Sequence, residues 1–269
     1  MASDDTHGTH DTGNPIKDKL AAGEPVFGIS LMEFQSSGWP TVFAQCGFDF
    51  LFVDMEHSTR SIDRIGSMIW TCLHSGIDPV VRVPSPQRFF ISRVLDAGAR
   101  TLIVPRVEEP DQVDRIVRYA LYPPEGDRSL AGSGRNFGLQ PQSDLRRATR
   151  ESNHRILIGI QIETRRGVDN IESLLGRPGV GMVFVGPSDL SLTMGIPGRF
   201  DHPDFTAALK TIAEATRRHG HVLGMQSMNV EFSKRMMTMG LRFVCCGSGI
   251  GLIRRYGAQV ALELRENAP

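Results

Sequence analysis

Short runs of apolar residues alternate with longer amphipathic stretches along most of the chain. A short apolar run is typical of a strand buried on both faces, and a longer amphipathic stretch is typical of a helix. The pattern predicts strands at residues 26–30, 50–54, 79–83, 101–105, 156–162, 182–185, 221–225 and 243–247.

The segments between these runs have helical periodicity. Ser61 suits a helix N-cap, and Gly76 suits the stop that follows that helix. The expected helices cover residues 17–23, 36–46, 61–74, 87–97, 110–121, 167–175, 204–219, 230–239 and 251–264.

Alternating strands and helices imply right-handed parallel units. Eight such units without a linker predict an α/β fold, a single-domain (β/α)8 TIM barrel over residues 15–269. An open doubly wound sheet is the alternative, because the number of strands does not establish closure. No GxGxxG motif follows the first strand, which weighs against a dinucleotide-binding fold.

Two segments fall outside this alternation. Residues 1–14 are polar and carry no apolar segment, so we expect a disordered tail rather than a secretory signal. Residues 122–151 are rich in Gly, Pro, Arg and Ser, and predict a long loop of the kind that is functional or mobile.

The composition argues against some classes of function. The 30 basic and 30 acidic residues balance, so we expect neither a nucleic acid nor a membrane as a partner. No apolar run approaches the length of a membrane span, roughly 20 residues. The four cysteines lack CxxC spacing, so we expect core thiols and a cytoplasmic location.

Polar side chains collect where the predicted strands end. In a parallel barrel these ends meet at one mouth, so residues far apart in sequence become neighbours. Chance exposure could explain one such residue, but several strands show the same feature, which favours a functional site. The residues at these ends are Asp54, Glu56, His57, Arg82, Gln161, Glu163 and Asp189.

Glu163 and Asp189 are expected on adjacent strands. Two carboxylates held close together favour a divalent cation between them, and oxygen ligands suit Mg²⁺ or Mn²⁺, with Co²⁺ or Zn²⁺ as further candidates. The alternative is a pair of structural carboxylates bound to Arg165 or Arg166. The turn at residues 186–189 offers the Ser188 and Asp189 amides as a small anion site, although an ordinary strand-to-helix turn has the same sequence.

Three further residues complete the predicted chemistry. Arg82 is a permanent cation that can stabilise an oxyanion, or alternatively a structural partner of Asp54 or Glu56. His57 suits a general base, with a buried structural histidine as the alternative. Asp96 interrupts an apolar run and needs a polar partner, which an imidazole would provide. No lysine lies at these strand ends, which counts against a Schiff-base mechanism.

Taken together, the motifs resemble those of the metal-dependent (class II) pyruvate aldolases, typified by 4-hydroxy-2-oxoheptanedioate aldolase and including 2-dehydro-3-deoxyglucarate aldolase and macrophomate synthase. The resemblance runs from about residue 17 to residue 264. It is carried by residues 48–57, 81–84, 94–99, 122–128, 161–163 and 185–191.

This resemblance implies a carbon–carbon lyase that cleaves or forms a 4-hydroxy-2-oxo acid through a pyruvate enolate, with pyruvate and an aldehyde as products. It implies a hexamer built as a trimer of dimers, with the last helix packed on a neighbouring subunit. The implied roles are metal binding by Glu163 and Asp189, substrate contact by Gln161, Ser188, Asp189 and Arg82, and catalysis by His57, Arg82 and Asp96.

Two other functions use similar residues. An oxaloacetate decarboxylase or an enolate-coupling enzyme needs the same metal and enolate, and a non-catalytic barrel would only bind 2-oxo acids. Met55, Arg106, Ser129, Met225 and Gln226 depart from the family pattern. These departures leave the aldehyde open, and Met55 is a candidate for deciding the substrate.

Overall fold

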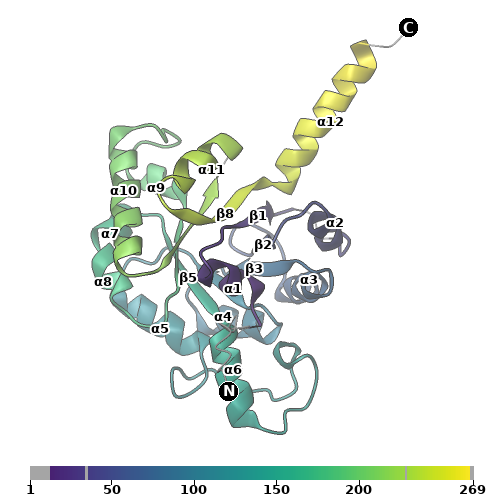
Figure 1. Ribbon diagram of the computed structural model, residues 1–269, viewed down its shortest axis with the longest axis vertical. Helices are drawn as coiled ribbons and strands as arrows, with labels where there is room; N and C mark the ends of the chain where they lie inside the picture. The colour runs from purple at the N-terminus through teal and green to yellow at the C-terminus, as the bar shows by residue number, and fades with distance from the viewer. Residues whose placement is uncertain (1–12, 34–35, 228, 267–269) are drawn as a thin grey trace, which may run out of the picture.

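The computed structural model describes residues 13–33, 36–227 and 229–266. Eight parallel strands follow one another in chain order, and the last pairs with the first, so the sheet is a closed barrel (Figure 1). The predicted (β/α)8 barrel is confirmed, and the open sheet is excluded. The strands are β1 Val26–Leu31, β2 Phe50–Asp54, β3 Asp78–Arg82, β4 Thr101–Val104, β5 Leu157–Ile162, β6 Met182–Val185, β7 Val222–Ser227 and β8 Leu241–Ser248.

Helices surround the barrel on its outer side (Figure 1). Ser61 caps α3 as predicted, because its side chain accepts a hydrogen bond from the Arg64 amide. The helices are α1 Pro15–Ala21, α2 Trp39–Gln45, α3 Ile62–His74, α4 Arg88–Asp96, α5 Pro110–Ala120, α6 Leu145–Arg155, α7 Arg165–Asp169, α8 Ile171–Leu175, α9 Pro187–Thr193, α10 Pro203–Arg218, α11 Val230–Met237 and α12 Gly249–Glu266, with a 3₁₀ turn, η1, at Arg135–Phe137.

The predicted loop at 122–151 is partly helical. It contains η1 and most of α6, which begins where the Asp144 side chain accepts from the Arg147 amide. α6 buries only Ala148 and Ser152, so its sequence lacks the apolar periodicity that identifies a helix. The turn after β6 is likewise the start of a short helix, α9, with Pro187 in its first turn.

The core has two layers. One lies between the barrel and its helices, and the other fills the barrel interior, where Phe50 stacks on Phe243 at 4.3 Å and Phe52 on Phe184 at 5.6 Å between ring centroids. Gly28 is needed here, because a Cβ at this position would lie 2.2 Å from the Phe50 ring. The interior is therefore solid below the mouth.

The amino-terminal end of the barrel is closed by α1, whose Ile16 and Leu20 join the interior cluster. Asn14 belongs to this closure rather than to the predicted tail. It is fully buried, caps α1 and donates hydrogen bonds to the Arg100 and Arg155 carbonyl oxygens. Residues 1–12 of the predicted tail lie outside the described residues.

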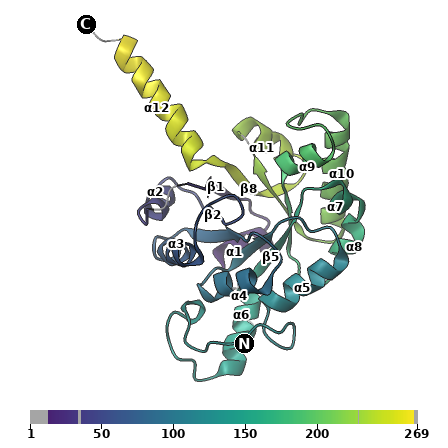
Figure 2. The same cartoon turned by 180° about the vertical axis from the view of Figure 1, so that it is seen from behind.

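The last helix, α12, extends away from the barrel in both views (Figures 1 and 2). Its residues are exposed along almost the whole length, including the large apolar side chains of Ile253, Tyr256, Val260 and Leu264. Within the described part of the chain, no helix is long and apolar enough to span a membrane.

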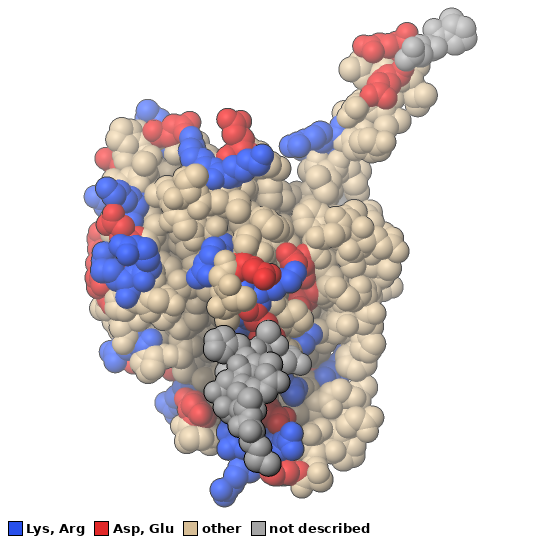
Figure 3. Space-filling view, in the orientation of Figure 1, with Lys and Arg blue, Asp and Glu red and all other residues tan. Residues whose placement is uncertain are grey.

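Two remaining composition-based predictions can be compared with the structure. Basic and acidic side chains are interspersed on the face shown in Figure 3, in keeping with their equal numbers. All four cysteines are free, but only Cys72 and Cys245 are buried. Cys46 is exposed and Cys246 is half-buried, so the prediction of four core thiols was wrong for these two.

Candidate active site

The carboxyl ends of the strands surround a cavity of about 190 Å³ at the mouth of the barrel. Parallel strands in a closed barrel direct these ends to the same face, which brings together residues from β2, β3, β5 and β6. Five of the predicted site residues line this cavity, namely His57, Arg82, Gln161, Ser188 and Asp189.

Arg82 at the end of β3 is held by Asp54 at the end of β2. These two residues are register partners, and the guanidinium donates to both Asp54 oxygens, with 3.0 Å from Nε to Oδ1. Burial alone would lower the pKa of Arg82, but its hydrogen bonds to Asp54 and the charges of Asp54, Glu56 and Glu163 raise it. The structural ion pair considered from the sequence is therefore present, and Arg82 also lines the mouth.

The turn after β2 presents Glu56 and His57. The Asp54 carboxylate accepts from the Glu56 amide at 2.9 Å, which fixes the turn. The His57 side chain is 53% exposed, and its Nε2 lies 4.0 Å from Glu56 Oε2. Burial raises the pKa of Glu56, with Arg82 and His57 opposing that shift. His57 is thus free to meet a substrate, and the buried structural histidine is excluded.

Glu163 lies just beyond β5 and is 2% exposed. Its Oε1 accepts from the Arg106 amide at 2.8 Å, and its Oε2 accepts from the Gln161 side chain. Burial raises the pKa of Glu163, and the charges of Glu56 and Asp189 add to this effect. Neither Arg165 nor Arg166 is among these contacts, so the alternative of an arginine-bound carboxylate does not describe Glu163.

The strand-to-helix turn after β6 packs directly on Glu163. A Cβ at Gly186 would lie 2.6 Å from Glu163 Oε2 and 2.9 Å from Gln161 Nε2, so any other residue here would displace these two side chains. The amides of Ser188 and Asp189 fall in the first turn of α9, where a helix provides no internal acceptor. The same turn therefore brings a carboxylate and two amides without an intrahelical acceptor to the mouth.

The donor set at the mouth suits a divalent cation. Glu163, Glu56 and Asp189 act on one another as like charges, and the buried Oε1 of Gln161 has no hydrogen-bond partner in the described part of the chain. A cation would neutralise the carboxylates and accept oxygen ligands. Among the described residues, no group of three or more His, Cys, Asp or Glu side chains is placed to hold a metal. Protein carboxylates would thus supply only part of its coordination.

Asp96 is not brought to His57 within one chain. It ends α4 and precedes β4, which places it toward the amino-terminal end of the barrel, opposite the mouth. Its carboxylate accepts from Arg128 at 2.6 Å. The polar partner of Asp96 is therefore Arg128, an arginine of the loop that follows α5. Asp96 does not reach the mouth because the C-terminus of a barrel helix lies at the opposite end of the barrel from the carboxyl ends of the strands.

The residues that depart from the family pattern differ in whether they line the mouth. Met55 and Met225 are buried in the layer between barrel and helices, so neither lines the mouth, and Met55 does not contact the substrate cavity directly. Gln226 does line it, beside Met32 of the β1–α2 connection. Met32 was not among the predicted site residues, because the strand before it, β1, ends without a titratable residue.

Comparison with known proteins gives consistent matches. The model of the family described as HpcH/HpaI aldolase/citrate lyase matches residues 37–255. A hydroxypyruvate/pyruvate aldolase from Paraburkholderia phytofirmans is 34% identical, covering 94% of this chain and 98% of its own. A 5-keto-4-deoxy-D-glucarate aldolase from Klebsiella pneumoniae is 35% identical, covering 79% and 82%. The crystal structure of an HpcH/HpaI aldolase from Desulfitobacterium hafniense has a TM-score of 0.88 at 28% identity, covering 94% and 97%.

Proposed function

The chain belongs to the HpcH/HpaI aldolase/citrate lyase family and is a carbon–carbon lyase, and from this premise we propose how its mouth works. The proposed reaction cleaves a 4-hydroxy-2-oxo acid to pyruvate and an aldehyde through the pyruvate enolate. One observation carries the proposal: the Arg82 cation and the Asp189 carboxylate line one cavity, with the buried carboxylate of Glu163 against its Gly186 wall.

Glu163 and Asp189 would hold a divalent metal, Mg²⁺ or Mn²⁺ by the hardness of their oxygens. When bound, such a cation would supply Lewis-acid chemistry, stabilising the negative charge that develops on a 2-oxo acid beside it. The Ser188 and Asp189 amides would bind the substrate carboxylate, and Gln161 would contact it from below. These roles are supported by Gln161, Ser188 and Asp189 lining the mouth cavity, and by the hydrogen bond that Gln161 donates to Glu163.

Arg82 stabilises the charge that develops on the 2-oxo oxygen. The guanidinium is fixed by Asp54, so it needs no rearrangement when the enolate forms. This interaction strengthens as negative charge builds up and therefore favours the transition state over the ground state.

His57 acts as the base. It removes the proton from the 4-hydroxyl group, the C3–C4 bond breaks, the aldehyde leaves, and the remaining electron pair forms the enolate of pyruvate. A proton returned to C3 then gives pyruvate. The half-exposed imidazole at the rim of the cavity supports this role.

The aldehyde portion would extend toward Gln226 on β7 and Met32 just after β1, which line the same cavity. The relatives are named for hydroxypyruvate, pyruvate and 5-keto-4-deoxy-D-glucarate. We propose a hydroxylated aldehyde for this chain as well, because a side-chain amide at the wall can hydrogen-bond a hydroxyl group. Comparing glycolaldehyde with propionaldehyde as acceptors would test this, and an equal rate with both would count against it.

The exposed stripe of α12 supports assembly with further copies, proposed here as a hexamer of three dimers. Ile253, Tyr256, Val260 and Leu264 form an apolar stripe at helical spacing that one chain leaves uncovered. An apolar cavity of about 440 Å³ at the base of α12 shares Met32 and Gln226 with the mouth. The α12 of a neighbouring copy seated there would complete one wall of the site.

We also propose a cytoplasmic location. Four free cysteines, one of them exposed, support a reducing compartment. Fractionation of the source cells, with the protein followed by an antibody, would test this assignment.

Proton exchange into pyruvate tests the central proposal. The metal-free protein is incubated with pyruvate in D₂O, with or without Mg²⁺ or Mn²⁺, and the methyl signal is followed by NMR. We expect exchange that requires metal, is abolished by Glu163→Ala and is slowed by His57→Ala. Glu172→Gln, an exposed carboxylate on α8, is the control and should exchange normally. Absence of exchange with every metal would exclude the enolate mechanism.

A further inference from the structure

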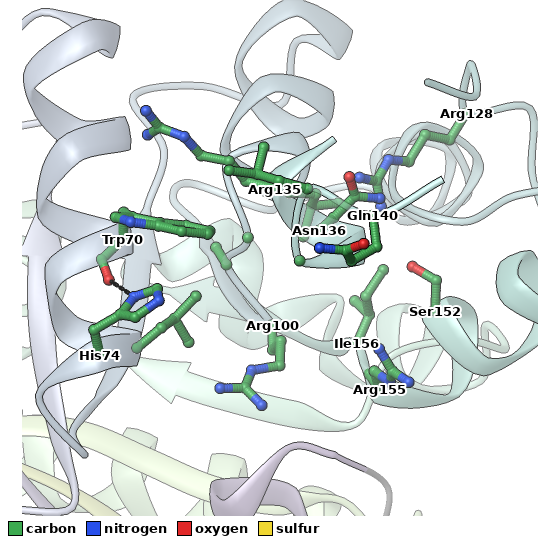
Figure 4. A pocket seen from close by; sticks show the side chains of 16 residues that line it. Trp70, His74, Arg100, Arg128, Arg135, Asn136, Gln140, Ser152, Arg155 and Ile156 are labelled. Carbon is green, nitrogen blue, oxygen red and sulfur yellow. Dashed lines mark hydrogen bonds between the residues drawn. The ribbon is translucent and has the colours of Figure 1, made fainter. Parts of the chain in front are cut away.

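A second cavity lies at the amino-terminal end of the barrel, away from the mouth. It measures about 500 Å³ and lies between α3, the α4–β4 connection, the loop at 128–140 and the end of α6 (Figure 4). That volume is within the range of small-molecule sites, roughly 300 to 1,000 Å³. None of the proposed catalytic residues lines it, so the reaction at the mouth leaves this cavity without a role.

The cavity has a strongly basic lining. Figure 4 shows Arg100 and Arg155 along one edge and Arg128 and Arg135 along the other, with Gln140 in the space between. Of the described residues that line it, none is an aspartate or glutamate. Guanidinium groups present paired donors that match carboxylate and phosphate oxygens.

Neighbouring carboxylates neutralise this charge only in part. Arg100 is paired with Asp78 at 3.1 Å, and Arg128 with Asp96 at 2.6 Å. Arg135 donates to the Gly66 carbonyl oxygen and has no carboxylate partner within the described chain.

For the remaining arginine, Arg155, the described residues offer only a distant carboxylate partner. It lies 3.7 Å from Glu151, whose other oxygen is bound more closely, at 2.6 Å, by Arg147. With Arg135, this leaves two cationic groups with unused donors at the cavity wall.

Unsatisfied buried atoms also point to a missing acceptor. Arg128 is only 3% exposed, yet its Nε has no hydrogen-bond partner among the described residues, and neither has Arg100 Nε. A buried donor left without an acceptor destabilises the fold. An anion in the cavity would supply oxygen atoms near these groups, while Trp70, Leu139 and Ile156 offer apolar wall for an organic portion.

We propose that this cavity binds a small multivalent oxyanion, carrying a phosphate group or several carboxylates, at a site separate from the catalytic mouth. Two sources share this chemistry, a phosphate ester and a polycarboxylate. The proposal does not depend on the reaction assigned to the mouth.

Calorimetric titration of the metal-loaded protein tests the site with inorganic phosphate, a nucleoside monophosphate and tricarballylate. We expect at least one of them to bind once per chain and to remain bound when pyruvate is added. Binding of the two phosphate compounds alone would identify the ester source, and binding of tricarballylate alone the polycarboxylate source. No binding by any of the three, or displacement by pyruvate, would overturn the proposal.

Paired variants locate the binding. In Arg135→Gln/Arg155→Gln the affinity should fall by about tenfold or more, since each lost charged hydrogen bond corresponds to roughly that factor. Arg146→Gln/Arg150→Gln removes two charges from exposed positions of α6 and should bind as the natural protein does. Arg135→Lys keeps the charge without the paired donors and should be intermediate. Equal affinity in all of these proteins would overturn the proposal.

Discussion

The backbone N–H of Arg106 donates a 2.8 Å hydrogen bond to Oε1 of Glu163, and Arg106 makes this bond from a left-handed conformation with φ of 52°. For a residue other than glycine this conformation costs about 1 to 2 kcal/mol. Such strain is commonly found at functional sites. Here it lies at the end of β4, where the bond fixes a proposed metal ligand beyond β5.

Arg106→Gly should therefore preserve the site. Glycine adopts positive φ without strain and keeps the N–H, so we expect Mn²⁺ affinity within about twofold of the natural protein and no loss of melting temperature. Arg106→Pro removes the donor and restricts φ to negative values, so it should weaken Mn²⁺ binding about tenfold or more. Mn²⁺ titration followed by electron paramagnetic resonance measures both. Similar affinities in the two variants would show that the bond does not position Glu163.

Metal binding should depend on pH through Glu163. Burial raises the pKa of this carboxyl, and the charges of Glu56 and Asp189 add to the rise. A metal ligand must be ionised, so affinity should increase as the pH rises through this elevated pKa. Titrations at several pH values, with release of about one proton per metal ion, would check this. A flat profile through the weakly acidic range would refute it.

The same shift predicts an opposite effect on stability. Because the folded-state pKa of Glu163 lies above its unfolded value, ionisation disfavours the metal-free fold, and stability falls as the pH rises between those two values. Glu163→Gln should flatten this dependence and raise the free energy of unfolding near neutral pH by roughly 1 kcal/mol, while metal binding is lost. Urea denaturation of metal-free protein at two pH values measures the difference. A destabilised Glu163→Gln would contradict it.

Asp54→Ala should be strongly destabilising. It leaves the buried Arg82 guanidinium without its main partner, which typically costs about 3 to 5 kcal/mol. Asp111→Ala breaks an exposed pair with Arg115 and serves as the control, with an expected cost below about 1 kcal/mol. Equal costs by chemical denaturation would mean that the buried pair has no special role.

Removal of α12 should dissociate the assembly. A chain ending at Gly249 lacks the exposed apolar stripe, and we expect a monomer in sedimentation velocity together with reduced exchange activity, since the wall near Met32 and Gln226 would be open. Tyr256→Glu/Val260→Glu should act in the same direction, while Ala258→Glu, off the stripe, should leave the assembly intact. An unchanged sedimentation coefficient after truncation would exclude α12 as the contact.

The fold was largely predictable because its strands are short runs dominated by buried apolar residues. Phe50–Asp54 was predicted to the residue, since all five positions are buried and the polar turn follows at once. The same rule located Arg82, Gln161 and Glu163 at strand ends, where the barrel brings them together. α6 escaped prediction because most of its surface faces solvent and carries charge.

The site was less predictable where the role of a residue depends on neighbours that are distant in sequence. Asp96 stands in an apolar run, but the sequence cannot show that Arg128 reaches it. Arg106 acts through its backbone, so its side chain gives no signal. Met55 looked like a departure at the mouth, yet the pleat after β2 directs it into the outer core.

Closure of the barrel by β8 on β1 has a consequence for synthesis of the chain. Until Leu241–Ser248 has been made, β1 and β7 are open edges, and open edges of apolar strands are prone to pair with other chains. The pairing partners of β1 are then separated by nearly the whole sequence, which slows folding. A nascent chain thus carries this aggregation hazard until β8 has been translated, and chaperone demand should concentrate in that interval.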